Sequence, residues 1–199
     1  MRELPADIYP DSLSRVPLLK REELDEHGKK YYDAVTGAGS RTLAGLQGPS
    51  GIWLNSPKLA AHLRAANQYL RYETTLGRRL TELAILVTAR ELDHQFEWTA
   101  HEPAALAEGL APETIDVVKY GKPITGMADT EALIITFGRE LFRDRHLRSE
   151  TFARAVAIFG RPGVLDLVAL MGNYAMTALI LTAFDQQVHL DRQPLLPTL

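Results

Sequence analysis

Apolar positions along the chain recur at helical spacing, and turn-forming residues separate one apolar stretch from the next. No run alternates apolar and polar residues as a half-buried strand would. The spacing predicts helices at about 21–35, 57–73, 78–91, 94–108, 112–120, 129–143, 149–160 and 162–185. We therefore expect an all-α fold, a compact bundle of about seven or eight helices.

Polar residues that can cap a helix precede several of these segments. Ser56 is expected to be the N-cap of one helix, with Pro57 at its first helical position. The same pattern predicts caps at Asp93, Asp129 and Ser149.

Two segments lack a helical pattern. Residues 1–19 contain three prolines, so we expect an extended arm there. Residues 37–51 hold five glycines, which predicts a flexible connector or lid. Neither GxGxxG nor GK[ST] occurs in this loop, so a phosphate-binding role is not favoured. Residues 20–199 show no linker and no repeat, and a single helical domain is expected there.

The composition narrows the class of protein. The net charge of −3 gives no basic surface for nucleic acid or an anionic membrane. The chain has no cysteine, which excludes disulfides, thiolate metal sites, iron–sulfur clusters and thiol redox cycles. The first ten residues mix charges and prolines, unlike a secretory signal. A cytoplasmic location is the expectation.

The stretch 167–184 carries no charge and reaches the length of a membrane span. Gly172, Asn173 and Tyr174 interrupt it, and Asp166 and Asp185 bound it. This composition favours a helix in the core or at a subunit interface over a membrane span.

Candidate chemistry begins at Glu82, the one charged residue in the segment 80–89. One helical turn further on are Ile85 and Leu86, so the carboxylate should face apolar surroundings. Burial would raise the pKa of Glu82 and suit it to proton transfer. The alternative is a structural carboxylate paired with Arg78, Arg79 or another basic residue.

His94, Glu97 and His101 follow at spacings i, i+3 and i+7, within an arc of about 60° on one helix face. A Glu97–His101 hydrogen bond at i, i+4 would fix the imidazole tautomer, as in a general acid/base. The alternatives are chance alignment on a solvated face and a metal site built from the three side chains. The spacing is not H-E-x-x-H, and the di-iron pattern needs two Glu-x-x-His copies.

The combined motif Glu82-x11-His94-x2-Glu97-x3-His101 resembles the carboxymuconolactone decarboxylase superfamily, which includes alkylhydroperoxidase D-like proteins. In the peroxidase branch the pattern is Glu-x11-Cys-x2-Cys-x3-His. His94 and Glu97 stand where the cysteines would be. The decarboxylase branch has Glu-x3-His at the positions of Glu97 and His101. Residues 48–63, 69–87 and 172–181 are similar to longer decarboxylase-like members.

The resemblance implies an all-helical fold that assembles as homotrimers or homohexamers, and a small-molecule substrate. It implies a cofactor-free, decarboxylase-like lyase acting on a small unsaturated carboxylic or carbonyl compound. His101 would transfer the proton, Glu97 would orient it, and His94 and Glu82 would be accessory. Arg71, Arg78 or Arg79 are candidates to anchor a substrate carboxylate. The alternatives are a non-catalytic or ligand-binding helical oligomer and a metal-binding protein. We expect no nucleic-acid partner, no membrane partner and no cofactor.

The missing cysteine pair generates a first prediction. Metal-stripped protein should not turn over peroxide with a dithiol reductant, because the disulfide relay of the peroxidase branch has no thiols here. A coupled assay of dithiol-dependent peroxide consumption measures this. Multiple turnovers per chain would contradict the prediction.

Overall fold

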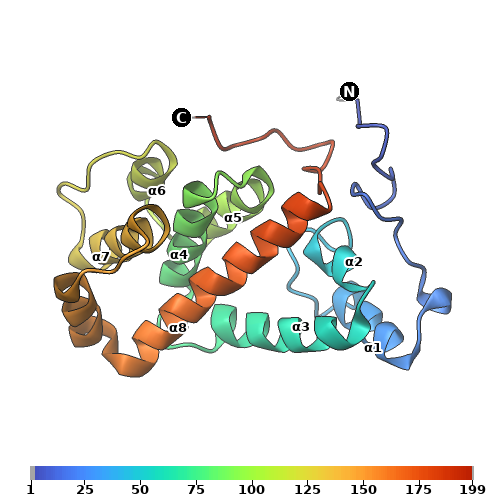
Figure 1. Cartoon of the computed structure of the whole chain (residues 1–199), viewed down its shortest axis with the longest axis horizontal. Coiled ribbons are helices and arrows are strands. Elements are labelled where there is room, and N and C mark those ends of the chain that lie inside the picture. Colours follow the sequence, from blue (N-terminus) through green and yellow to red (C-terminus); the bar gives the residue numbers. More distant parts are fainter. Residues whose placement is uncertain (1–2, 199) are drawn as a thin grey trace. The chain divides into compact units, whose positions relative to one another are not determined.

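The computed structural model describes residues 3–198, so residues 1, 2 and 199 of the predicted arm and domain lie outside it. Within these described residues, eight α-helices follow one another (Figure 1). They are α1 (Glu26–Thr36), α2 (Pro49–Trp53), α3 (Pro57–Tyr72), α4 (Arg78–Glu91), α5 (Gln95–Ala107), α6 (Pro112–Lys119), α7 (Asp129–Arg139) and α8 (Ser149–Ala183). A 3-10 turn, η1 (Arg21–Glu23), and a π-helical turn, η2 (Glu140–Asp144), complete the set. The predicted all-α fold is confirmed.

Several predicted boundaries differ from the structure. Asp129 does not cap α7: Ala128 is the N-cap and Asp129 lies in the first turn, where its charge still favours the helix dipole. The segments 149–160 and 162–185 form one long element, α8, interrupted at Gly160. Gly160 has φ +68°, a conformation that glycine adopts without steric cost. Helix α2, inside and just after the predicted loop, is too short to show periodicity.

The contacts of the chain divide it into two compact units. Unit 1 contains the residues up to Ala66 and Leu179–Gln193, and unit 2 contains Asn67–Ala178 and the residues from Pro194 on. Unit 1 therefore holds Trp53, and unit 2 holds Trp98. The prediction of one domain over 20–199 concerns independent folding and stays a prediction.

In unit 1, the extended N-terminal segment is hydrogen-bonded to the segment that ends and follows α8. The Arg15 amide donates to the carbonyl of Phe184 over 2.9 Å, and the Gln187 amide donates to Leu13 over 2.8 Å. The buried Gln186 side chain donates to the carbonyl of Ser12 over 3.1 Å. The arm is thus held by backbone bonds to its own unit.

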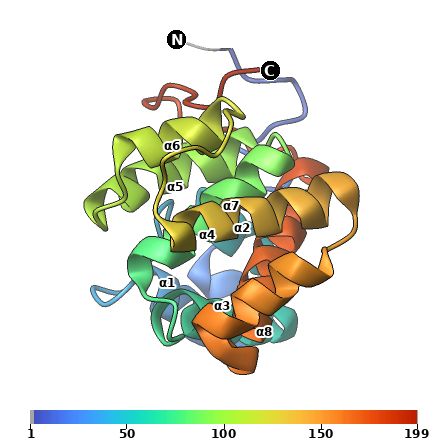
Figure 2. The ribbon, with the colours of Figure 1, turned by 90° about the vertical axis from the view of Figure 1, so that its left-hand side faces the viewer.

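In unit 2, α4 is the central helix. Residues 81–90 are all buried, because α5, α6 and α7 pack around them. Figure 2 views this unit from the side of α6 and α7, with α4 behind α7. Leu167, Leu170 and Met171 of α8 belong to the same hydrophobic core. A polar side chain within residues 81–90 is therefore enclosed by helices.

Among residues 3–198, one helix, α8, is long and apolar enough to cross a membrane by length and composition, and half of its most apolar window is buried. Core helices of soluble proteins pass the same test, so a single such helix is weak evidence for a membrane span. The core contacts of its middle section agree with the predicted core helix.

The close packing of α7 generates a second prediction. A Cβ atom on Gly138 would overlap Val87 of α4 and approach Met171 to 3.3 Å. Gly138→Ala should therefore destabilise the protein by about 1–3 kcal/mol through overpacking. Urea unfolding measures the change.

Gly172→Ala is the matched control, because a Cβ there meets no atom within 4 Å. It should leave stability unchanged or raise it by about 0.4–1 kcal/mol, through a lower entropy of the unfolded chain. Equal effects of the two substitutions would contradict the packing described here.

Candidate functional site

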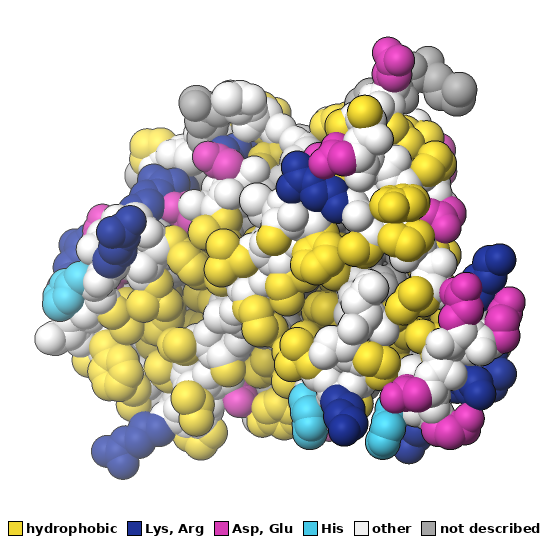
Figure 3. Space-filling model, turned by 45° about the vertical axis from the view of Figure 1, so that its right-hand side comes forward, with side chains coloured by type: hydrophobic (Ala, Val, Ile, Leu, Met, Phe, Trp, Pro, Cys, Tyr) yellow, Lys and Arg dark blue, Asp and Glu magenta, His cyan; other side chains and the backbone are white. Residues whose placement is uncertain are grey.

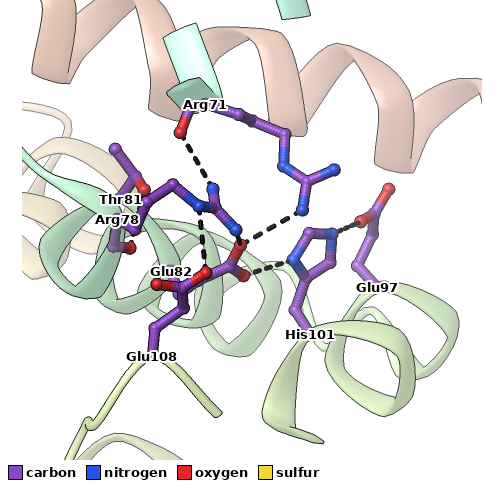
Figure 4. A network of polar contacts seen from close by, with 7 residues as sticks. All are labelled: Arg71, Arg78, Thr81, Glu82, Glu97, His101 and Glu108. Atoms are coloured by element: carbon purple, nitrogen blue, oxygen red, sulfur yellow. Dashed lines mark hydrogen bonds and ion pairs between the residues drawn. The ribbon is translucent and has the colours of Figure 1, made fainter. Parts of the chain in front are cut away.

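Glu82 lies at the centre of a buried polar network in unit 2 (Figure 4). The residue is on the core-facing side of α4, and its side chain has no exposed surface. Oε1 accepts hydrogen bonds from Arg71 Nη2 over 3.1 Å and Arg78 Nη2 over 2.7 Å. Oε2 lies 2.6 Å from Nδ1 of His101. The carboxylate is thus held by three side chains from α3, α4 and α5.

These partners set the charge of Glu82. Burial favours the neutral acid, but His101, Arg71 and Arg78 outweigh it and lower the pKa of Glu82 to about 2. The expected raised pKa of Glu82 is therefore wrong, and its pairing with Arg78 is confirmed. An ionised carboxylate only accepts, so Nδ1 of His101 carries the hydrogen.

His101 lies between two carboxylates. Glu97 and His101 are both 4% exposed, one turn apart on α5. Nε2 of His101 is 3.5 Å from Oε2 of Glu97, farther than its other nitrogen is from Glu82. The ring of Tyr174 meets His101 edge-on, with centroids 5.0 Å apart. Glu82, rather than Glu97, is the closer partner that fixes the tautomer.

The two carboxylates have opposite charge states. Burial raises the pKa of Glu97 to about 8; Arg71 opposes this shift and the charge of Glu82 adds to it. Burial also lowers the pKa of His101, against the attraction of Glu82. Burial raises the pKa of the neighbouring Tyr174 phenol, which stays neutral. At neutral pH Glu97 is therefore protonated, His101 is neutral and Glu82 is ionised.

His94 has a different position from the one expected. Asp93 has φ +50° and is not a cap; His94 is the N-cap of α5, and its Nδ1 accepts from the Glu97 amide over 3.3 Å. Burial lowers the pKa of His94 to about 4, although a bond to the backbone of Ala178 raises it. The ring is therefore neutral and hydrogen-bonded to the backbone of Glu97 and Ala178.

The metal-binding alternative gains no support from this arrangement. Because His94 precedes the helix, its ring does not share the helical stripe of Glu97 and His101. Within residues 3–198, no group of three or more histidine, aspartate or glutamate side chains is arranged to hold a metal ion.

Arg78 extends the network toward solvent. Its Nη1 donates to the carbonyl of Arg71 over 2.8 Å and its Nε to Glu108 over 3.2 Å. The guanidinium carbons of Arg78 and Arg71 lie 4.4 and 5.0 Å from the centre of the Tyr72 ring. Of the three arginines considered from the sequence, Arg79 is elsewhere, paired with Glu131.

Sequence reasoning missed Tyr174, Tyr72 and Glu108. Tyr174 lies within 172–181, a segment similar to longer decarboxylase-like members. That similarity is the one signal in the sequence that points to this residue. Tyr72 and Glu108 occupy a helix end and a C-cap, where tyrosine and glutamate are unremarkable.

Two comparisons with known proteins show what this chain is similar to. The fold is similar to the crystal structure of an alkylhydroperoxidase AhpD core, an uncharacterized peroxidase-related protein from Ralstonia eutropha JMP134, with a TM-score of 0.72. The sequences are 12% identical, and the match covers 90% of this chain and 94% of that one. No curated protein matches the chain. The protein thus has an alkylhydroperoxidase D-like fold.

Residues 57–132, from the start of α3 into α7, match the family model described as the Carboxymuconolactone decarboxylase family. This segment contains Glu82, Glu97, His101 and both network arginines. Over this segment the chain is similar to the carboxymuconolactone decarboxylase family, and this match and the fold both support the resemblance that the motif predicted.

The position of His94 generates a third prediction. The folded pKa of about 4 lies below the ordinary 6.5, so the unfolded chain binds more protons between these values. Stability should therefore fall as the pH falls from 6.5 toward 4. His94→Asn keeps a capping oxygen and should reduce this slope by up to about 1.4 kcal/mol per pH unit. Urea unfolding across this range measures it.

His94→Ala is the companion variant, because it also removes the cap. It should lose about 1 kcal/mol at every pH, in addition to the altered slope. A His94→Asn variant with the pH dependence of the natural chain would show that His94 is not buried in its neutral form.

Proposed function

We propose that the protein is a cofactor-free acid/base enzyme, a decarboxylase-like lyase acting on a small unsaturated carboxylic or carbonyl compound. One observation carries the proposal: a buried, neutral His101 lies between an ionised Glu82 and a protonated Glu97. Pairs of carboxylates whose pKa values are pushed apart are typical of acid/base sites.

The charge states assign a role to each group. Glu97 holds a proton at neutral pH and releases it near its pKa of about 8, a range suited to general acid catalysis. Glu82 keeps the hydrogen of His101 on Nδ1, so Nε2 faces Glu97. Glu97 is thus proposed as the proton donor and His101 as the group that restores its proton. The sequence motif instead suggested His101 as the proton-transfer residue, Glu97 as its orienting partner and Glu82 as accessory.

The reaction balances with these groups alone. Breaking the carbon–carboxylate bond releases CO2 and leaves its electron pair on the substrate, where a conjugated carbonyl accepts it as an enolate. Glu97 then protonates the enolate carbon and becomes a carboxylate. His101, which lies between Glu82 and Glu97, then takes up a proton from solvent and passes it to Glu97. No external oxidant or reductant is required.

A homo-oligomer, a trimer or hexamer, remains part of the proposal. Leu165 in unit 2 is 69% exposed and Leu179 in unit 1 is 70% exposed. Figure 3 shows further hydrophobic side chains on one face of the molecule. Apolar exposure of this kind favours contact with another protein surface. We further propose a cytoplasmic location, on the cysteine-free composition.

The proposed roles generate a fourth prediction. Conjugated lactone acids and β,γ-unsaturated acids whose alkene is conjugated with a carbonyl, tested as a panel in D2O, should include one that releases CO2 and takes up deuterium at carbon. His101→Asn and Glu97→Gln should each lower this turnover by ~100-fold or more, the range for a lost acid/base group. NMR of the products and a CO2 assay measure both steps. Glu113→Gln, an exposed glutamate on α6, is the control and should retain full activity.

The charge state of Glu97 can be tested without a substrate. Its folded pKa of about 8 exceeds the ordinary 4.5, so its contribution to stability is present below pH 4.5 and is lost as the pH rises to 8. Glu97→Gln should abolish this loss and become progressively more stable than the natural chain over that range. An unchanged pH dependence in Glu97→Gln, or full turnover by His101→Asn, would refute the assigned roles.

A further inference from the structure

Arg71 has a buried hydrogen-bond donor without an acceptor. Its side chain is 7% exposed, and Nη2 donates to Glu82, but Nε has no hydrogen-bond partner. The Tyr72 ring near the guanidinium offers a π face rather than a lone pair in the plane of that N–H. An unpaired buried donor is unfavourable and rare in folded proteins, so its presence beside the candidate site points to a ligand atom.

Arg78 is a second guanidinium at the same place. Both arginines donate to Oε1 of Glu82 and both lie against Tyr72, so the two groups are neighbours. Two of the acceptors of Arg78, Glu82 and the Arg71 carbonyl, belong to buried residues. The third, Glu108, has a side chain that is 36% exposed. An ion pair to a group this exposed is weak, so Glu108 can be displaced.

The charges of the site favour an anion. Arg71 and Arg78 carry two positive charges, and Glu82 supplies one negative charge. The groups facing Glu97 are Arg71, Glu82, His101 and Tyr174, and with Glu97 protonated the buried part has an excess of one positive charge. The carboxylate of Glu108 offsets this charge from the solvent side. A small monoanion in its place would give the same balance inside the site.

We propose that the guanidinium groups of Arg71 and Arg78 form a binding site for a small monocarboxylate, which displaces Glu108 from Nε of Arg78 and accepts from Nε of Arg71. The inference rests on the proposed function in one respect: the bound carboxylate is read as that of the substrate. The site thereby selects molecules with one negative charge near the Glu97–His101 pair.

The test uses acetate as the probe, added at pH 7 and constant ionic strength against sodium chloride. Acetate should shift the Arg71 Nε–H signal in nitrogen–proton NMR and give a dissociation constant. Glu108→Gln removes the competing carboxylate and should tighten acetate binding by about 2- to 5-fold, the range for an exposed ion pair. Arg71→Lys keeps the charge, loses the fixed guanidinium fork, and should weaken binding by about 10-fold or more.

Glu113→Gln is the matched control, because it makes the same charge change at an exposed position on α6. It should leave acetate binding unchanged. Equal tightening by Glu108→Gln and Glu113→Gln, or no effect of Glu108→Gln, would overturn the site. The absence of any acetate-dependent shift in both the natural chain and Glu108→Gln would do the same. Because Glu108→Gln changes an exposed residue, the test does not depend on Arg71→Lys folding.

The same measurements separate this inference from the proposed function. If His101→Asn binds acetate like the natural chain while no acid in the panel is turned over, the anion site stands and the proposed reaction fails. If an acid is turned over but its KM is the same in Glu108→Gln and the natural chain, the reaction stands and the anion site fails. If both hold, the KM for that acid should fall in Glu108→Gln.

Discussion

The buried charge of Glu82 is the constraint on which the remainder of the site depends. An ionised carboxylate enclosed by helices is stable only if donors surround it, and here Arg71, Arg78 and His101 supply them. Removing any one would leave this buried carboxylate short of a hydrogen-bond donor, at a cost of about 1–3 kcal/mol. Because the donors come from the end of α3, the start of α4 and the middle of α5, the same requirement fixes how these helices meet.

The unequal distribution of donors is what gives the site its chemical character. Glu82 and Glu97 flank one imidazole, yet Glu82 accepts the hydrogen bonds of both arginines and has the shorter contact to His101. Glu97 is left with burial and a nearby negative charge, both of which favour the protonated acid. Two glutamates that flank the same histidine thus differ in protonation: Glu82 is ionised and Glu97 is neutral. Glu97 stays protonated because Glu82 is ionised and takes the donors.

Much of this could be predicted from the sequence, where the signal was local. The predicted helices at 57–73 and 78–91 contain long stretches with apolar residues at helical spacing, and the structure confirms their bounds to within one residue. The burial of Glu82 followed from its apolar neighbours on α4. Glu97 and His101 had to share a stripe, because i, i+4 spacing fixes their separation on any helix.

What could not be predicted came from other helices or from outside helical phase. The proximity of Glu82 to His101 depends on how α4 and α5 pack, which no spacing within one helix reveals. His94 was misplaced because the positive φ of Asp93 breaks the helix just before it, so its side chain does not follow the 100° step. Tyr174 lies on α8, so its contact with the His101 ring depends on how the core is packed.

The division of the chain into two compact units has a spectroscopic consequence. The sequence contains two tryptophans, and one lies in each unit: Trp53 in the first and Trp98 in the second. Both indoles are buried, so the emission of each should move to longer wavelength when its own surroundings are exposed to water. Intrinsic fluorescence therefore carries a separate marker for each half of the molecule. Replacing one indole by phenylalanine leaves the other as a reporter of its unit, and coincident or separate denaturation midpoints would show whether the two halves lose structure as one cooperative body.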